Sequence, residues 1–331
     1  MAMTQVAICQ LRTTCSASEN LRASSSLVAK CAHLGSQIIF LPENCCFMGT
    51  FPGESNGHAT SMSASDPASL VAPYASLAKE HGVWLSLGGV QEDSGVPMEG
   101  SDPPKNKVNN SHVLIDPQGQ VASVYRKIHL FDVDLSATGG PKLLESSFTN
   151  PGDPNQANVV PETPMGSLGL AICYDMRFPY LFQRLRFEKG ADVLTAPSAY
   201  TVPTGRAHWH ALLRSRAIEN QCFMVAAAQV GRHWPGKRLS YGHSIIIDPW
   251  GAVVADLGGA SNKTPVVPED ATLVPLDEDM LTAPTPDAEK VNDEESVEGA
   301  FVGAVVVNLT PETLASTRAK MPIASHRRPI A

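Results

Sequence analysis

One segment of the chain runs Ile245-Ile246-Ile247-Asp248-Pro249-Trp250-Gly251-Ala252-Val253, and an earlier one, Val113-Leu114-Ile115-Asp116-Pro117-Gln118-Gly119-Gln120-Val121, repeats its pattern. Each begins as an apolar strand, turns at Asp-Pro-x-Gly and starts a second strand. Proline presets φ in such a turn and glycine accepts a positive φ, so each segment predicts a β-hairpin. Two hairpins in corresponding places favour a pseudo-symmetric pair of sheets over one open sheet.

Short apolar runs alternate with amphipathic segments on both sides of these hairpins. Near-continuous apolar runs such as Ile38-Ile39-Phe40-Leu41 are typical of a sheet that is covered on both faces. The alternation therefore predicts an α/β fold. We expect strands at residues 5–11, 37–41, 84–90, 167–172, 192–197, 222–230 and 301–307, and helices at residues 17–34, 67–81, 179–189, 204–219 and 311–320.

The composition is that of a globular protein with a large core. The chain has 331 residues, 43% of them hydrophobic, which suits one large domain over residues 1–331. It contains neither a run of about 18 apolar residues nor the pattern of a secretory signal, so we expect no membrane span. Seven cysteines without metal-type spacing predict reduced thiols. We therefore expect a cytoplasmic protein, with a mitochondrial pool as the alternative.

Negative charge is concentrated in one region. The net charge is −8, whereas residues 256–298 hold 12 Asp or Glu and 2 Lys. The remainder is nearly neutral and has no basic stripe, which argues against nucleic acid as a partner. Residues 257–299 are rich in Pro, Asp, Glu and Thr and poor in aromatic residues, so we expect a mobile acidic loop inserted between two strands.

Three apolar runs end in reactive side chains. Glu43 follows Ile38-Ile39-Phe40-Leu41-Pro42, Lys127 follows Val124-Tyr125-Arg126, and Cys173 follows Gly169-Leu170-Ala171-Ile172. If these strands are neighbours, a carboxylate, an amine and a thiol meet at one sheet edge. Such a set supplies a base, a cation for an oxyanion and a nucleophile.

Cys173 differs from the other cysteines in its context. We expect Cys9, Cys31 and Cys222 to be buried structural residues, because they lie in apolar runs. Cys173 instead precedes the polar sequence Tyr174-Asp175-Met176-Arg177 and a helix that opens near Pro179. This strand-turn-helix pattern would lift the sulfur onto an exposed elbow. A free thiol has a pKa of about 8.5, so it needs activation by its surroundings.

These motifs resemble the nitrilase superfamily, the carbon–nitrogen hydrolases. The matching segments are Leu41-Pro42-Glu43, Tyr125-Arg126-Lys127-Ile128-His129-Leu130 and Cys173-Tyr174-Asp175-Met176-Arg177-Phe178-Pro179. The resemblance extends from Val6 to Arg327-Arg328-Pro329. It implies a four-layer α-β-β-α sandwich with two mixed sheets. It also implies Glu43, Lys127 and Cys173 as catalytic residues.

The resemblance also implies a mechanism. Glu43 acts as the base, Cys173 attacks an amide carbonyl, and Lys127 with the backbone N–H of Tyr174 stabilises the oxyanion. Glu145, in Leu143-Leu144-Glu145-Ser146, resembles a second active-site glutamate of the family. We expect a small-molecule amide as substrate, and neither a metal nor an organic cofactor.

Further segments are similar to the deaminated glutathione amidase branch of this family, which cleaves its substrate to 2-oxoglutarate and cysteinylglycine. They are Thr204-Gly205-Arg206-Ala207-His208-Trp209, Arg214-Ser215-Arg216-Ala217-Ile218-Glu219, Ala226-Ala227-Ala228-Gln229-Val230-Gly231-Arg232-His233 and Tyr241-Gly242-His243-Ser244. The alternatives are omega-amidase action on 2-oxoglutaramate or 2-oxosuccinamate, and a catalytically silent binding protein on the same fold. A Cys–His protease would need His129 or His243 beside Cys173.

Other polar residues carry weaker expectations. The candidates for substrate binding are His129, Arg177, Tyr200, Arg232 and His233, although Arg177 also suits a structural role. We expect structural roles for Asp175, Arg214 and Arg216, packing for Cys45 and Cys46, and core or interface positions for Trp209 and Trp250. His208 and His210 lie two apart on a predicted helix and so point to different faces, which makes a metal pair of these two unfavourable. The family resemblance implies a homodimer through helices 179–189 and 204–219.

Overall fold

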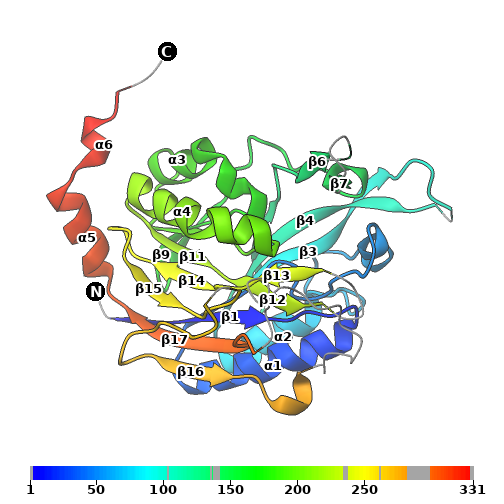
Figure 1. Cartoon of the computed structure of the whole chain (residues 1–331), viewed down its shortest axis with the longest axis horizontal. Coiled ribbons are helices and arrows are strands. Elements are labelled where there is room, and N and C mark those ends of the chain that lie inside the picture. The colour runs from blue at the N-terminus through cyan, green and yellow to red at the C-terminus, as the bar shows by residue number, and fades with distance from the viewer. Residues whose placement is uncertain are drawn as a thin grey trace.

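The computed structural model describes residues 3–102, 104–134, 136, 142–233, 238–260, 262–281 and 299–328. In this part of the chain two mixed sheets lie face to face, with helices on the outer side of each (Figure 1). The predicted four-layer α-β-β-α sandwich is confirmed.

The larger sheet contains nine strands in the described residues, ordered β13-β12-β1-β2-β3-β4-β5, with β17 beside β1 and β16 beside β17. β1, β2 and β3 are parallel, whereas β3, β4 and β5 form an antiparallel meander. The strands are β1 (Thr4–Leu11), β2 (Ile38–Leu41), β3 (Trp84–Pro97), β4 (Asn106–Ile115), β5 (Val121–Arg126), β12 (Ala228–Arg232), β13 (Leu239–Tyr241), β16 (Thr272–Pro275) and β17 (Gly303–Leu309).

The smaller sheet contains six strands in the described residues, ordered β15-β14-β11-β10-β9-β8. They are β8 (Val159–Thr163), β9 (Gly166–Gly169), β10 (Val193–Thr195), β11 (Phe223–Ala226), β14 (Ile245–Ile247) and β15 (Val253–Asp256). A separate ribbon pairs β6 (Asp132–Asp134) with β7 (Lys142–Leu144). The two predicted hairpins are confirmed: β4 and β5 turn in the larger sheet, and β14 and β15 turn in the smaller one.

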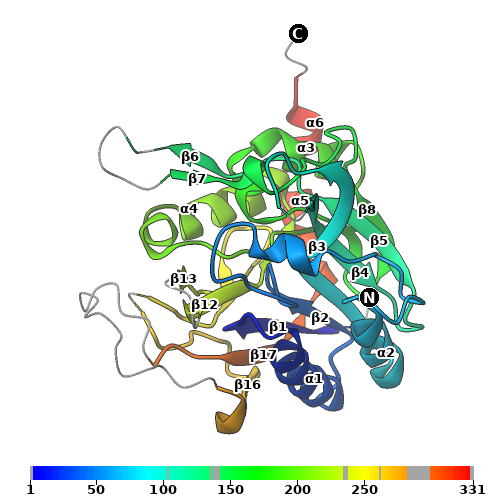
Figure 2. The ribbon, with the colours of Figure 1, turned by 90° about the vertical axis from the view of Figure 1, so that its right-hand side faces the viewer.

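Helices cover each sheet from outside. α1 (Ala17–His33) and α2 (Ala72–His81) pack on the larger sheet, and α3 (Pro179–Phe187) and α4 (Val202–Asn220) pack on the smaller one (Figures 1 and 2). α5 (Pro311–Lys320) and α6 (Ile323–His326) follow β17 toward the C-terminus. No helix in the described ranges is long and apolar enough to cross a membrane.

The predicted start of α2 at residue 67 is wrong, because the helix begins at Ala72. The preceding amides are taken by side chains: Leu70 N–H donates to Thr60 Oγ1 at 3.0 Å, and Val71 N–H donates to Ser69 Oγ at 3.1 Å. Hydroxyl groups that bind nearby backbone in this way favour turns over helix.

Side chains of the parallel strands alternate between two hydrophobic cores. Val6 and Ile8 of β1 face the smaller sheet, whereas Ala7 and Cys9 face α1 and α2. Both sets are fully buried. Because successive residues of a strand point to opposite faces, a strand buried on both sides must be apolar at every position. The continuous apolar runs of the sequence have this cause.

The predicted strand 222–230 is two strands in different sheets. β11 ends at Ala226 in the smaller sheet, and β12 begins at Ala228 in the larger one. The buried hydroxyl of Ser244 accepts the Ala228 N–H at 2.8 Å and donates to Cys9 O at 3.0 Å, which ties this crossing to β1. The chain therefore joins the two sheets directly at Ala227.

Part of the predicted acidic loop at residues 257–299 is regular structure, so that prediction is wrong for this part. β16 pairs antiparallel with β17, and Val274 and Leu276 are buried. Asp277 forms an ion pair of 2.6 Å with Lys30 of α1. Thr272 to Leu276 has the alternation of an edge strand, which the acidic composition of the whole segment concealed. Residues 261 and 282–298 lie outside the described residues.

Candidate active site

The structure brings Glu43, Lys127 and Cys173 together, although they lie far apart in the chain. Glu43 comes two residues after β2 and Lys127 directly after β5, both in the larger sheet, whereas Cys173 follows β9 of the smaller sheet. Lys127 Nζ lies 3.5 Å from Glu43 Oε1, and the two residues are only 3% and 4% exposed. The Glu43 carboxylate raises the pKa of the Cys173 thiol, and the Lys127 ammonium lowers it. The site therefore lies where the ends of strands from the two sheets meet.

Cys173 has an unusual backbone conformation. Its φ is 45°, in the left-handed region that non-glycine residues seldom occupy. Its N–H donates to Pro197 O at 3.0 Å. A short 3₁₀ helix (Cys173–Arg177) then leads into α3. The predicted turn between strand and helix is present, and its strain is typical of a functional site.

The electrostatics keep Cys173 protonated at rest. Burial and the neighbouring Glu43 carboxylate raise the pKa of the Cys173 thiol, and the Lys127 ammonium offsets this only in part. Burial lowers the pKa of Lys127, but Glu145 and Glu43 raise it by more, so Lys127 stays charged. A thiol with a raised pKa cannot act as a resting thiolate. The Cys173 thiol therefore needs a neighbouring base to remove its proton, and Glu43 is the carboxylate that raises its pKa.

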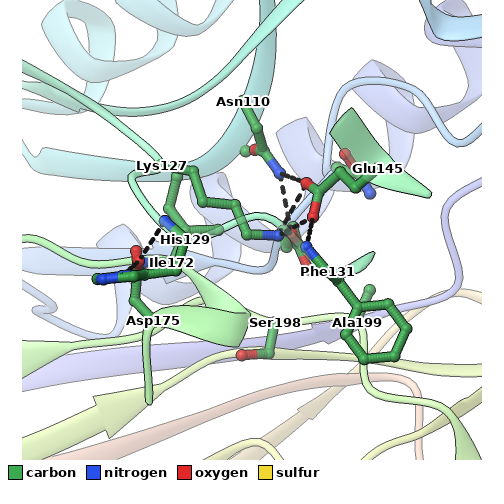
Figure 3. A network of polar contacts seen from close by, with 12 residues as sticks. Asn110, Lys127, His129, Phe131, Glu145, Ile172, Asp175, Ser198 and Ala199 are labelled. Atoms are coloured by element: carbon green, nitrogen blue, oxygen red, sulfur yellow. Dashed lines mark hydrogen bonds and ion pairs between the residues drawn. The ribbon is translucent and has the colours of Figure 1, made fainter. Parts of the chain in front are cut away.

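Glu145 is the second carboxylate that contacts Lys127. It follows β7, and both of its carboxylate oxygens lie 2.9 Å from Lys127 Nζ. Its Oε2 also accepts the Phe131 N–H at 2.6 Å. Figure 3 shows the lysine and glutamate side chains pointing at each other, with Asn110 beside them. This arrangement fixes the position of the ammonium group.

Asn110 belongs to the site and was missed in the sequence. Its Nδ2 donates to Glu43 Oε1 at 3.0 Å and to Glu145 Oε1 at 3.5 Å, and its backbone O accepts the Lys127 N–H at 2.9 Å. Asn110 therefore contacts all three charged neighbours. An asparagine inside a strand is unfavourable, so the pair Asn109-Asn110 within β4 was the available signal.

Two glycines let β3 approach Glu43. A Cβ at Gly88 would lie 2.2 Å from Pro197 Cβ and 2.9 Å from Glu43 N. Gly89 has φ of 67°, and a Cβ there would lie 2.7 Å from Asn110 Oδ1. Neither position has room for a side chain. The strand register shifts between Leu87 and Val90, which places the irregularity beside Glu43.

Asp175 is a buried structural hub, in keeping with the role expected for it. One oxygen accepts the Tyr125 hydroxyl at 2.8 Å and the Ile172 N–H at 3.0 Å. The other contacts His129, through its N–H at 3.1 Å and Nδ1 at 2.7 Å. Asp175 thus ties the Cys173 turn to the segment that carries Lys127.

The geometry does not support a Cys–His pair. His129 Nδ1 contacts Asp175 and its Nε2 contacts Tyr180 Oη at 2.5 Å. His243 Nδ1 contacts Asp256 at 2.9 Å and its Nε2 contacts Ala260 O at 3.0 Å. Both nitrogens of each ring already have partners other than Cys173. The stacking of His129 on Phe178, with centroids 3.7 Å apart, also places it as a packing residue.

The remaining substrate-binding candidates lie in different environments. Tyr200 is 7% exposed, and its hydroxyl has no partner among the described residues. Burial and Cys173 raise the pKa of the Tyr200 phenol. Arg177 is half-buried and donates to His208 Nδ1 at 3.1 Å. Arg232 is half-buried at the end of β12.

His233 is not suited to bind substrate, contrary to expectation. It is buried, and its two ring nitrogens contact Thr13 O and Ser240 Oγ, each at 2.7 Å. Burial lowers the pKa of His233 to about 3. A neutral imidazole with both nitrogens engaged has nothing left to offer a ligand, so His233 joins β12 to the segment after β1.

Several structural expectations agree with the contacts. Arg216 donates to Met176 O at 3.0 and 2.7 Å, and Arg214 donates to Gly251 O at 2.9 Å. Cys45 and Cys46 are buried free thiols with sulfurs 3.9 Å apart. The other described residues with expected structural roles are buried Cys9, Cys31, Cys222 and Trp209 and exposed Trp250. His208 contacts Arg177 and His210 contacts Asp256, so these two histidines do point to different places.

The fold and the Glu–Lys–Cys site are those of a hydrolase that acts on carbon–nitrogen bonds other than peptide bonds. The family model described as "Carbon-nitrogen hydrolase" matches residues 5–269, so the chain belongs to this family.

Curated and solved relatives agree with this family. The chain is 46% identical to the Mus musculus "Deaminated glutathione amidase" over 253 residues, which cover 76% of this chain and 73% of the relative. The crystal structure of the C. elegans NitFhit protein is similar with a TM-score of 0.74 and 33% identity, over 99% of this chain and 66% of that one. A Saccharomyces cerevisiae member of branch 10 of the nitrilase superfamily has the same fold, with a TM-score of 0.69, 24% identity, and coverage of 98% of this chain and 97% of that one.

Proposed function

We propose that this chain is an amidase that hydrolyses deaminated glutathione to 2-oxoglutarate and cysteinylglycine through a cysteine thioester. The observation that carries the amidase chemistry is the meeting of buried Glu43 and Lys127 with the partly buried Cys173. The substrate is proposed from the similarity to curated deaminated glutathione amidases, which are 44% to 46% identical over 76% of the chain.

In the first step Glu43 removes the thiol proton and Cys173 Sγ attacks the amide carbon. The carbonyl oxygen becomes an oxyanion. Lys127 supplies a fixed positive charge for it, and the Tyr174 N–H, which has no acceptor among the described residues, supplies a hydrogen bond. Both donors are in place before the reaction, so little reorganisation is needed.

In the second step Glu43 returns the proton to the leaving nitrogen, and the carbon–nitrogen bond breaks. Cysteinylglycine departs with a free amine, and the 2-oxoglutaryl group remains as a thioester on Cys173. Glu43 then takes a proton from water, the resulting hydroxide attacks the thioester, and 2-oxoglutarate leaves as the thiol regains its proton. Glu43 is therefore both base and acid.

Glu145 and Asn110 act as positioning residues in this scheme. Glu145 holds the lysine ammonium by two contacts of 2.9 Å, and Asn110 orients Glu43 by its 3.0 Å hydrogen bond. The proposed substrate carries carboxylates at both ends. Arg177 and Arg232 are guanidinium groups suited to them, and the Tyr200 hydroxyl, which has no partner among the described residues, is a further proposed contact. His129 is left out of this set, because both of its ring nitrogens already have partners.

A substrate panel tests this proposal. Wild type and Cys173→Ala are compared on deaminated glutathione, 2-oxoglutaramate and 2-oxosuccinamate. We expect the highest kcat/KM on deaminated glutathione, and background turnover in a Cys173→Ala variant whose circular dichroism and Tm are unchanged. Near-normal turnover by that variant would exclude the mechanism. A preference for 2-oxoglutaramate would assign omega-amidase activity instead, and a folded wild type whose Cys173 resists electrophilic substrate mimics would favour a silent binding protein.

We also propose a cytoplasmic homodimer that pairs through α3 and α4. Tyr180 and Ile218 on these helices and Trp250 on the adjacent turn are large exposed apolar residues, at 60%, 44% and 59%. Exposed aromatic groups of this kind suit an interface. Sedimentation of wild type and Tyr180→Glu tests the pairing, and a monomeric wild type at micromolar concentration would contradict it. The free cysteines support a reducing compartment.

A further inference from the structure

We propose that His210, His243 and Asp256 form a binding site for a divalent transition metal, best suited to Zn²⁺, outside the Cys173 chemistry. The three residues come from separate elements: His210 from α4, His243 from the segment after β13, and Asp256 from the end of β15. Their ligand atoms all lie within 4.8 Å of one another. Two imidazoles and a carboxylate are a ligand set that zinc prefers.

The spacing is close to that of a coordinated ion. His210 Nε2 lies 2.9 Å from Asp256 Oδ2, and His243 Nδ1 lies 2.9 and 3.0 Å from the two carboxylate oxygens. Ligand atoms in a tetrahedral zinc site with bonds of about 2.0 Å are about 3.3 Å apart. The carboxylate and each imidazole therefore need to separate by only a few tenths of an ångström. His210 has the freedom to do so, because its side chain is 37% exposed.

The groups behind the ligands hold them in place. His243 Nε2 contacts Ala260 O at 3.0 Å, which leaves Nδ1 as the nitrogen directed at the site. Asp256 Oδ1 accepts the Gly258 N–H at 2.8 Å. Backbone partners of this kind orient metal-binding histidines and carboxylates. The Tyr241 ring stacks on His243 with centroids 4.6 Å apart and prevents it from rotating.

The contacts within the group are ones that a cation can replace. The Asp256 carboxylate contacts a ring nitrogen of both histidines, and a bound ion would take the place of the protons between them. Each imidazole would then offer a lone pair to the ion, and any proton displaced from that nitrogen would leave to solvent or move to the other nitrogen of the ring.

Titration of the full chain with Co²⁺, followed by its visible absorption, tests the site. The Cys173→Ala background removes the catalytic thiol, which could bind the metal on its own. We expect one Co²⁺ per chain with the intense bands of tetrahedral cobalt, Zn²⁺ to displace it, and Zn²⁺ to raise the Tm. His210→Ala should weaken binding at least tenfold, because it removes one of three ligands.

His208→Ala is the matched control, since His208 lies on the same helix and contacts Arg177 instead. It should bind Co²⁺ as the background protein does. His210→Gln keeps a donor for Asp256 without the imidazole and should fold but bind weakly. The proposal is overturned by a lack of saturable binding, by unchanged affinity in both His210 variants, or by equal weakening in the His208 variant.

Discussion

The ammonium nitrogen of Lys127 lies 2.9 Å from each carboxylate oxygen of Glu145. Its distance from Glu43 Oε1 is longer, at 3.5 Å. The two glutamates therefore differ in their relation to the lysine. Both carboxylate oxygens of Glu145 contact Lys127, whereas Glu43 contacts Lys127 and Asn110 and also raises the pKa of the Cys173 thiol.

Glu145→Gln should lower kcat about 100-fold while KM changes little, because the positioned cation acts on the oxyanion and not on the bound amide. Glu145 also raises the pKa of Lys127. The alkaline limb of the kcat profile should therefore move to lower pH in the variant. Steady-state kinetics across pH measure both effects. Glu80→Gln, an exposed glutamate on α2, is the control, and an unmoved alkaline limb would argue against this role for Glu145.

Glu43→Gln should make the Cys173 thiol easier to ionise although it abolishes turnover. Glu43 raises the pKa of this thiol and Lys127 lowers it. The pH at which iodoacetamide labelling of Cys173 becomes fast should fall in Glu43→Gln and rise in Lys127→Met. Mass spectrometry of the labelled Cys173 peptide measures the rate. Shifts in the same direction for both variants would contradict the proposed charge arrangement.

Asn110→Asp should reduce kcat more than Asn110→Ala does. The alanine variant loses one hydrogen bond to Glu43, which we expect to cost about tenfold in kcat. The aspartate variant places a third carboxylate beside Glu43 and Glu145, so like charges crowd the base. Asn106→Asp, at the start of the same strand, provides the control. Equal activity of the two Asn110 variants would exclude the charge effect.

Asp175→Asn should destabilise the fold by about 2–4 kcal/mol, because a buried carboxylate with several hydrogen bonds is replaced by an amide that cannot accept them all. Urea unfolding monitored by tryptophan fluorescence measures this change. Asp153→Asn, an exposed aspartate near β8, should leave the unfolding free energy within 0.5 kcal/mol of wild type. A free energy of unfolding within the same range for Asp175→Asn would show that Asp175 does not stabilise the link between the Cys173 turn and the segment that carries Lys127.

The protein should lose stability as pH falls below about 6.5. Burial lowers the pKa of His112 to about 4 and that of His233 to about 3. The unfolded chain therefore binds more protons than the folded one between the folded pKa values and about 6.5, and acid favours unfolding. For His112 alone the effect approaches about 3 kcal/mol at the acid end.

Guanidinium unfolding at pH 7 and pH 4.5 measures this loss. His112→Asn should reduce the pH dependence even though it lowers stability at pH 7, whereas replacing the exposed His33 of α1 should not change it. A free energy of unfolding that is constant or rises toward acid pH would contradict the neutral state of both buried rings.

The resemblance to the nitrilase superfamily predicted the sandwich and the meeting of Glu43, Lys127 and Cys173, and local signals in the sequence agreed with it. An Asp-Pro-x-Gly turn and a reactive residue after an apolar run are visible within a few positions. The crossing at Ala227 was missed because residues 222–228 are uniformly apolar, and no residue type marks a change of sheet. β16 was missed for the opposite reason, since four residues cannot be seen against an acidic background.

Asn110 shows what the sequence could not reveal about the site. Its role depends on the register of β4 against β3, and on the two glycines that bring β3 close to Glu43. The pairing of strands depends on contacts between residues far apart in the sequence, whereas a motif contains information only about residues adjacent in the sequence. His233 was misjudged for the same reason, because its partners Thr13 and Ser240 lie elsewhere in the chain.

Cys173 and Glu43, the proposed nucleophile and base, follow strands of different sheets. Turnover should therefore be sensitive to any sliding of one sheet against the other. Glu43 and Lys127 travel with one sheet and Cys173 with the other, so a small relative slip would part the thiol from its proton acceptor without breaking a strand pair. Warming or mild denaturant should therefore abolish turnover before the far-UV ellipticity changes. Turnover would then report on the packing of the two sheets against each other.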